Sequence, residues 1–159
     1  MPRKDITMTP EEIDDFLDAP LTLQVITIGR DGHPHAAPMW YVVRDREIWF
    51  RSFSKSQKIV NLARDPRITV LAEAGTAYSE LRGVMIRGRT ELIDDSAIVL
   101  SLYRELAGRY PMIDDAVAPD LDPDTAEALF GTYATKNTAV RVRAERVASW
   151  DHRKIGGGY

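Results

Sequence analysis

The segment LTLQVITIGRDGHPHAAPMWYVVRDREIWFRS, residues 21–52, carries most of the fold information, because strand-forming runs alternate in it with tight turns. Its first run, residues 21–29, is rich in β-branched residues and is followed by the turn sequence RDG. We expect a second strand over about residues 35–43 and a third over residues 47–52. Three strands joined by such short connections predict an antiparallel meander.

On both sides of this segment, the residue patterns predict three more strands and four helices. The further strands are expected at about 67–73, 82–93 and 139–150. The helices are expected at about 10–18, 56–64, 96–108 and 124–130. Gly88 interrupts the strand expected at 82–93 and indicates a bulge, a sharp bend or a close backbone approach. Six strands with peripheral helices indicate a mainly β, α+β fold, an antiparallel six-stranded barrel that is closed or partly closed.

Length and composition narrow the class of protein. At 159 residues the chain is expected to form one domain, residues 1–159, with flexible tails at 1–8 and 151–159. The net charge of −3 argues against general nucleic-acid binding, and the absence of cysteine excludes disulfides and thiolate chemistry. No apolar run is long enough to span a bilayer, and the N-terminus turns acidic where a signal peptide is apolar. We therefore expect a cytoplasmic protein that binds neither nucleic acid nor membrane.

The run RSFSKSQKIVNLARDPR, residues 51–67, combines hydroxyl and cationic side chains at the start of a predicted helix. These groups are the hydroxyls and ammonium groups of Ser52, Ser54, Ser56, Lys55 and Lys58. Unpaired backbone N–H groups at a helix start, the positive end of its dipole and nearby cations all stabilise anions. A phosphate-bearing ligand is the first hypothesis. The alternative is an ordinary N-capped helix with a solvated basic face.

Aromatic side chains precede this run. Trp40 and Tyr41 follow Pro38 in the second strand, and Trp49 and Phe50 lie on the third. Such an apolar wall suits a planar ligand, although aromatic residues in neighbouring strands also form ordinary core. Proline donates no ladder hydrogen bond, so Pro38 indicates that the second strand is open or at a sheet edge there. Together these features predict a ligand with a planar ring on the second strand and a phosphate at the end of the third.

The remaining chemistry-bearing residues give less specific signals. His33 and His35 flank a proline, but no further ligands accompany them, so we expect surface histidines and no metal site. No G-x-S-x-G elbow is present, which argues against a serine hydrolase. No residue stands out as a general acid, and the catalytic residues stay unknown. Side chains considered for a substrate pocket, each with a structural alternative, are Tyr41, Tyr78, Trp150 and His152.

The order of these motifs, from LTLQVITIG through EIWFRSFSKSQKIVNLARDPR to ELRGVMIRGRTELIDD, resembles the split β-barrel flavin and deazaflavin oxidoreductases related to pyridoxamine 5′-phosphate oxidase. The resemblance covers about residues 9–109, and its most specific part is the pattern of Ser52, Ser56 and Lys58. It implies a split barrel in which this turn holds the cofactor phosphate, while backbone of about residues 37–40 lies against the isoalloxazine ring. It also implies a homodimer with both cofactor sites at the subunit interface.

Departures from that oxidase point to another branch of the family. The second strand reads Ala-Ala-Pro at 36–38, where the oxidase carries an arginine. The oxidase has a second arginine directly before the lysine of the motif, and this chain has Gln57 at that position, directly before Lys58. The residues that hold substrate phosphate in the oxidase have no match in the C-terminal DHRKIGGGY. Pyridoxamine phosphate oxidation is therefore not expected. The sequence resembles more closely the branch that uses coenzyme F420, a deazaflavin whose long anionic tail suits several spaced cations.

We therefore expect an oxidoreductase that uses coenzyme F420 for hydride transfer to or from a small organic substrate. The alternatives are an FMN-binding oxidase or reductase of the same family and a non-catalytic flavin- or haem-binding barrel. Arg87 faces away from the predicted core and is expected at the subunit interface or at the cofactor. The expected cofactor-binding residues are Ala37, Pro38, Met39, Trp40, Ser52, Lys55, Ser56, Gln57, Lys58, Arg64 and Arg87.

Overall fold

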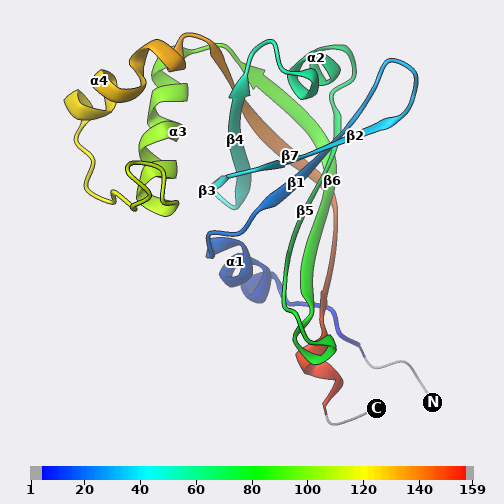
Figure 1. Cartoon of the computed structure of the whole chain (residues 1–159). Helices are drawn as coiled ribbons and strands as arrows, with labels where there is room; N and C mark the ends of the chain where they lie inside the picture. The colour runs from blue at the N-terminus through cyan, green and yellow to red at the C-terminus, as the bar shows by residue number, and fades with distance from the viewer. Residues whose placement is uncertain (1–4, 157–159) are drawn as a thin grey trace.

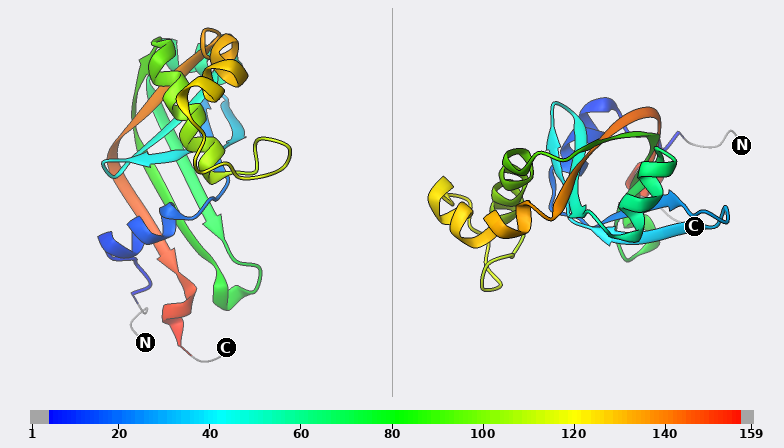
Figure 2. Two further views of the ribbon diagram at one scale, coloured as in Figure 1. Left: turned by 90° about the vertical axis from the view of Figure 1, so that its left-hand side faces the viewer. Right: turned by 90° about the horizontal axis from the view of Figure 1, so that it is seen from above.

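The structure, a computed structural model, describes residues 5–156 and is built around one seven-stranded antiparallel sheet. In sheet order the strands are β2 (Pro34–Met39), β1 (Leu23–Ile28), β5 (Arg67–Ala74), β6 (Arg82–Ile93), β7 (Asn137–Asp151), β4 (Glu47–Phe53) and β3 (Val42–Arg44). Seen from above, the sheet curls into a ring (Figure 2). The main apolar core includes Val25, Phe50, Val70 and Val140. The fold is mainly β, as the strand patterns predict.

The prediction of one strand over residues 35–43 is wrong, because this segment forms two strands at opposite edges of the sheet. β2 pairs with β1, whereas β3 pairs with β4, and β4 pairs in turn with β7. Tyr41 lies between β2 and β3 and is fully buried, and its Oη donates to the carbonyls of Leu17 and Ala19 at 2.8 and 3.1 Å. This anchored side chain accounts for the break. The sheet therefore has seven strands instead of six and is not closed by hydrogen bonds. The predicted meander is divided into two separate hairpins, β1–β2 and β3–β4.

Four helices flank the sheet: α1 (Pro10–Asp18), α2 (Gln57–Arg64), α3 (Ser96–Arg109) and α4 (Pro123–Ala134). α1 begins with the predicted capping box, in which Thr9 and Glu12 exchange hydrogen bonds of 3.2 and 2.7 Å. α2 lies at the upper end of the barrel, while α3 and α4 stand to one side of it (Figure 1). Within residues 5–156, none of these helices combines the length and the apolar character needed to cross a membrane.

β6 and β7 form the longest ladder of the sheet, and Gly88 interrupts it as expected. The register shifts between Arg87 and Gly88. A Cβ atom added at Gly88 would lie 2.0 Å from the carbonyl oxygen of Arg143. Only glycine allows the two backbones to approach this closely, so both the predicted bulge and the predicted close approach are confirmed.

Much of the two predicted tails is tied to the barrel. Met8 is buried, and its N–H donates to Ser149 Oγ at 3.0 Å. Asp151 is also buried and pairs with Arg153 at 2.6 Å, and residues 152–155 form the short 3₁₀ helix η2 (His152–Ile155). The expectation of free tails is therefore wrong for residues 5–8 and 151–156. Residues 1–4 and 157–159 lie outside the described part of the chain.

Candidate functional site

The sequence-predicted site residues lie on two strands with open edges and at the start of one helix. β2 ends the sheet, so one of its edges pairs with no strand. β3 pairs with residues 47–49 of β4, which leaves the last residues of β4 without a partner on that side. α2 follows β4 directly, and its Asn61 contacts Thr27 of β1, the strand beside β2. The Asn61–Thr27 contact therefore holds the middle of α2 against β1, beside the edge strand β2, at the upper end of the barrel (Figure 1).

Three of the predicted phosphate-binding residues contact one another at the start of α2. Ser52 is 4% exposed at the end of β4, and its Oγ lies 3.0 Å from Ser56 Oγ. The Lys58 Nζ donates to Ser52 Oγ at 3.1 Å. The hydroxyl–hydroxyl–ammonium spacing in the sequence therefore corresponds to one hydrogen-bonded cluster, hereafter the Ser52–Ser56–Lys58 cluster.

The surroundings of this cluster favour an anion. Ser56 is the N-cap residue of α2, but its side chain makes no capping hydrogen bond, so no side chain occupies the N–H groups of the first turn. Within residues 5–156, Lys58 pairs with no carboxylate. Burial lowers the pKa of the Lys58 ammonium. A phosphate here would complete the first turn of α2 and restore a counter-ion to Lys58.

Gln57 and Arg64 stand beside the cluster but are already engaged. The Gln57 Nε2 donates to Asn61 Oδ1 at 2.8 Å. The Arg64 Nη2 donates to the carbonyl of Ile28 at 2.5 Å and to Asn61 Oδ1 at 3.3 Å. Lys55 is exposed in the turn before α2. Among these three predicted residues, Lys55 is thus the one whose charged group reaches solvent without a partner in the described residues.

The predicted ring-binding segment lies on the edge strand β2. Pro38 is exposed on that edge strand, which confirms the edge position that its missing N–H predicts. Ala37 and Met39 are half-buried, and Met39 packs against the main core. Trp40 follows the strand, is 37% exposed, and stacks on Tyr110 with ring centroids 4.8 Å apart. The strand therefore offers its open backbone edge, with an aromatic surface at one end.

Arg87 makes no direct hydrogen bond to the cluster in the described residues. It is exposed on β6, directly opposite Thr69 of β5 and Arg146 of β7. With residues of β1 and β5 it lines a cavity of about 270 Å³. No hydrogen bond or ion pair in residues 5–156 joins Arg87 to Ser52, Ser56 or Lys58.

The two neighbouring histidines differ in environment. His33 is exposed, 3.4 Å from a carboxylate oxygen of Asp31. His35 is half-buried on β2, and its Nδ1 is shielded from solvent without a hydrogen-bond partner. The prediction of surface histidines is therefore wrong for His35, because its burial depends on the sheet and not on the local turn. The described residues contain no group of three side chains that could hold a metal ion.

The side chains considered for a substrate pocket are scattered. Tyr41 is buried structural core, and burial raises the pKa of its hydroxyl to about 12. Tyr78 and His152 contact each other in the tip below the barrel, with ring centroids 4.6 Å apart. Trp150 packs over Gly83, where a Cβ would lie 2.1 Å from its ring. None of the four lies in the Ser52–Ser56–Lys58 cluster.

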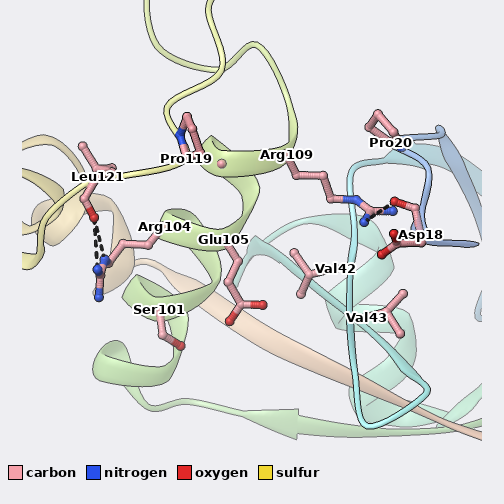
Figure 3. A pocket seen from close by; sticks show the side chains of 11 residues that line it. Asp18, Pro20, Val42, Val43, Ser101, Arg104, Glu105, Arg109, Pro119 and Leu121 are labelled. Carbon is pink, nitrogen blue, oxygen red and sulfur yellow. Dashed lines mark hydrogen bonds between the residues drawn. The ribbon is translucent and has the colours of Figure 1, made fainter.

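A cleft of about 720 Å³ lies elsewhere, between α3, the loop that follows it, β3 and the end of α1 (Figure 3). The arginine side chains that line this cleft already donate hydrogen bonds to backbone carbonyls of the chain. Arg109 donates to the carbonyls of Leu17, Asp18 and Ala19 at 2.6 to 2.9 Å, and Arg104 donates to the carbonyl of Leu121. We therefore place the candidate site at the start of α2 and not in this cleft.

Comparison with known proteins decides the family. A family model described as pyridoxamine 5′-phosphate oxidase matches residues 9–151. The chain belongs to this pyridoxamine 5′-phosphate oxidase family. No curated protein matches the sequence.

Solved structures show the same fold. A conserved hypothetical protein from Mycobacterium tuberculosis is 37% identical, with a TM-score of 0.87 over 100% of this chain and 94% of that one. A structure named F420 reductase is 21% identical, with a TM-score of 0.64 over 87% and 98% of the two chains. An FAD-binding protein from Mesorhizobium loti is 18% identical, with a TM-score of 0.59 over 90% and 94%. The last two likenesses concern the fold alone.

The residues present fit a flavin-type cofactor. Within residues 5–156, the start of α2 lacks a side-chain cap and Lys58 lacks a carboxylate partner. A phosphate would satisfy both groups, and the free edge of β2 would pair with the polar edge of a planar ring. The arginine that grips phosphate on the second strand of the oxidase is absent here, since β2 carries only one charged or titratable side chain, that of His35.

Proposed function

We propose that this chain is an oxidoreductase whose flavin-type cofactor lies along β2, with its phosphate at the Ser52–Ser56–Lys58 cluster. The observation that carries the proposal is the uncapped start of α2 beside a lysine with no counter-ion. β2 runs from this end of the barrel to Trp40, which suits a ligand with an anionic end and a planar end. Membership of the family supports the flavin class of cofactor.

The proposed cofactor is coenzyme F420, with FMN as the alternative. Lys55 and Lys58 pair with no carboxylate in residues 5–156, and Arg64 binds only oxygen atoms of Ile28 and Asn61. These three cations lie in or beside α2, and spaced cations suit a tail with several carboxylates. Arginines are absent from the positions where the oxidase of the family uses them. Both features favour the deazaflavin.

Once bound, such a cofactor supplies hydride transfer at one face of its ring. The chain's own part is binding and orientation. The Ser52 and Ser56 hydroxyls and the Lys58 ammonium hold the anionic end. The open edge of β2 orients the ring by backbone hydrogen bonds, and Trp40 supplies an apolar surface that keeps water from one side. A small organic substrate is proposed to bind on the side of the ring that remains open.

We also propose a homodimer. α3 and α4 cover one side of the barrel, whereas the side away from them carries α2 only at the upper end of the barrel (Figures 1 and 2). Arg87 and Arg146 lie directly opposite each other on β6 and β7, and neither forms an ion pair within residues 5–156. Two like charges directly opposite each other on neighbouring strands repel, unless an anion or a carboxylate of a partner subunit binds between them. Sedimentation velocity tests this proposal, and we expect a species with twice the mass of one chain.

Titration of the purified protein with each cofactor tests the proposed function. The absorbance spectrum first establishes whether a flavin or a haem is carried from the expression host. Coenzyme F420 and FMN are then titrated separately, and binding is followed by cofactor fluorescence. Tighter binding of F420 supports the proposal, and FMN binding without response to F420 would replace the cofactor. Binding of neither would overturn it.

A further inference from the structure

A further cavity lies between α1, β3 and the strands β6 and β7, and we call it the α1–β7 groove. Its volume is about 590 Å³, within the range of pockets that hold small organic molecules. Its apolar lining includes Ile13, Leu17, Val43, Ile86, Ala144 and Val147. Val147 is 46% exposed, so apolar surface of this groove is left in contact with water.

The groove lies where one edge of β7 has no neighbouring strand. β4 pairs with residues 137–141 of β7. Near the other end of β7, the chain before α1 lies beside the strand, since the Asp151 N–H donates to the carbonyl of Ile6 at 2.8 Å. Between these contacts residues 143–148 are all exposed, and no strand of the described chain pairs with them on this side. Unpaired backbone N–H and C=O groups therefore border the groove.

The charged side chains of the groove are not balanced. Arg46 is the one cation among the described residues that line it, and it pairs with Asp14 at 2.8 Å. Asp15 and Asp18 also line the groove, and neither carboxylate forms an ion pair within residues 5–156. The hydrogen bond from Arg109 goes to the main-chain carbonyl of Asp18. Two negative charges are thus left beside an apolar wall.

We propose that the α1–β7 groove binds a small organic cation, an amine with an apolar body. The apolar body covers Ile86 and Val147, and the ammonium group donates to the carboxylates of Asp15 and Asp18. A neutral ligand gains only the apolar contact, and the two carboxylates repel an anionic one. No residue of the Ser52–Ser56–Lys58 cluster lines the groove, so this site is separate from the proposed cofactor site.

Three probes with the same alkyl chain separate charge from apolar contact. They are octylammonium, octanol and octanoate, and their dissociation constants are measured by isothermal titration calorimetry at pH 7 and low salt. We expect octylammonium to bind about tenfold more tightly than octanoate, with octanol between them. Equal affinities for the three probes, or no binding of octylammonium, would overturn the proposal.

Two variants and a control place the binding in the groove. The double variant D15N/D18N removes both unpaired charges and keeps the side-chain shapes, so octylammonium affinity should fall about fivefold, to that of octanol. A144L narrows the groove and should weaken octylammonium and octanol alike. E73Q is the control, because Glu73 is an exposed carboxylate on β5 that does not line the groove. Thermal unfolding first shows that each variant is folded.

Unchanged octylammonium affinity in both D15N/D18N and A144L would contradict the proposal, because the probe then binds elsewhere. Sedimentation velocity of D15N/D18N tests another occupant. A monomeric variant beside a dimeric wild type would assign the groove to a second copy of the chain and overturn the proposal. Coenzyme F420 should bind D15N/D18N as tightly as wild type. Loss of F420 binding by wild type itself would refute the proposed function and leave this inference standing.

Discussion

Asn61 of α2 donates from Nδ2 to Thr27 Oγ1 on β1 at 3.0 Å, and both residues are fully buried. The Asn61 Oδ1 accepts from Gln57 at 2.8 Å and from Arg64 at 3.3 Å. One buried amide thus joins α2 to the sheet and also orders two side chains of the helix. The position of the helix start, and with it the proposed anion site, depends on this contact.

Replacement of Asn61 by leucine should lower the free energy of unfolding by about 1–3 kcal/mol, because the Thr27 hydroxyl is then buried without its partner. Urea unfolding followed by circular dichroism measures the change. T27V removes the other partner, and the double variant should lose less than the sum of the two single losses. Strict additivity would show that the pair does not join the helix to the sheet.

Arg109 to methionine should destabilise the fold by about 1.5–3 kcal/mol. Its guanidinium donates to the three carbonyls at the end of α1, of which Figure 3 shows that of Asp18, and it lies 4.7 Å from the centre of the Tyr41 ring. R104M is the matched control, since Arg104 donates only to the carbonyl of Leu121 at a loop. Thermal unfolding should show the larger shift for R109M. Equal shifts would contradict a special role for Arg109 at the end of α1.

Stability should fall as the pH rises from 10 to 12. Burial raises the pKa of Tyr41 from 10.0 to about 12, so in this window the unfolded chain releases a proton that the folded chain keeps. The contribution of Tyr41 is therefore present below pH 10 and is lost as the pH rises through 12. The slope is at most about 1.4 kcal/mol per pH unit. Y41F should show a smaller slope in urea unfolding across this range, whereas an unchanged slope would show that another group causes it.

Alanine at position 88 should destabilise the barrel by about 1–3 kcal/mol. The added Cβ would meet the carbonyl oxygen of Arg143 at 2.0 Å, and backbone cannot move aside as a flexible side chain can. G131A is the control, because the nearest atoms there belong to the side chain of Glu127. Comparable unfolding midpoints for the two variants would argue against a close backbone approach at the bulge.

Local signals in the sequence predicted the parts of the fold that depend on nearby residues. The RDG turn at 30–32 predicts the β1–β2 hairpin, the Thr9 capping box predicts the start of α1, and Gly88 predicts the bulge. The break between β2 and β3 escaped prediction because Tyr41 is held by carbonyls of α1, more than twenty residues away. The pairing of β4 with β7 also joins distant segments, and no local pattern encodes it.

The same distinction holds for the candidate site. Ser52, Ser56 and Lys58 lie within seven residues, so the turn that joins them follows from their spacing, and the structure brings them into contact. The burial of His35 could not be predicted from the sequence, because it arises only when β1 and β2 pair and α2 packs above them. Arg87 lies on the exposed face of β6, as its alternation with buried neighbours predicts. Its position relative to the cluster depends on the curvature of the whole sheet, which no local pattern encodes.

The dissociation constant of coenzyme F420 for K58A, alone and combined with S52A, tests the proposed anion site most directly. Loss of a charge-assisted hydrogen bond to phosphate costs about 2 kcal/mol, so affinity should fall at least tenfold in K58A and further in the double variant. K154A is the control, because Lys154 pairs with Glu12 and belongs to η2, which lies at the opposite end of the barrel from α2 (Figure 1). The account predicts tight binding by wild type and K154A and weak binding by both site variants. Wild-type affinity in both site variants would contradict it.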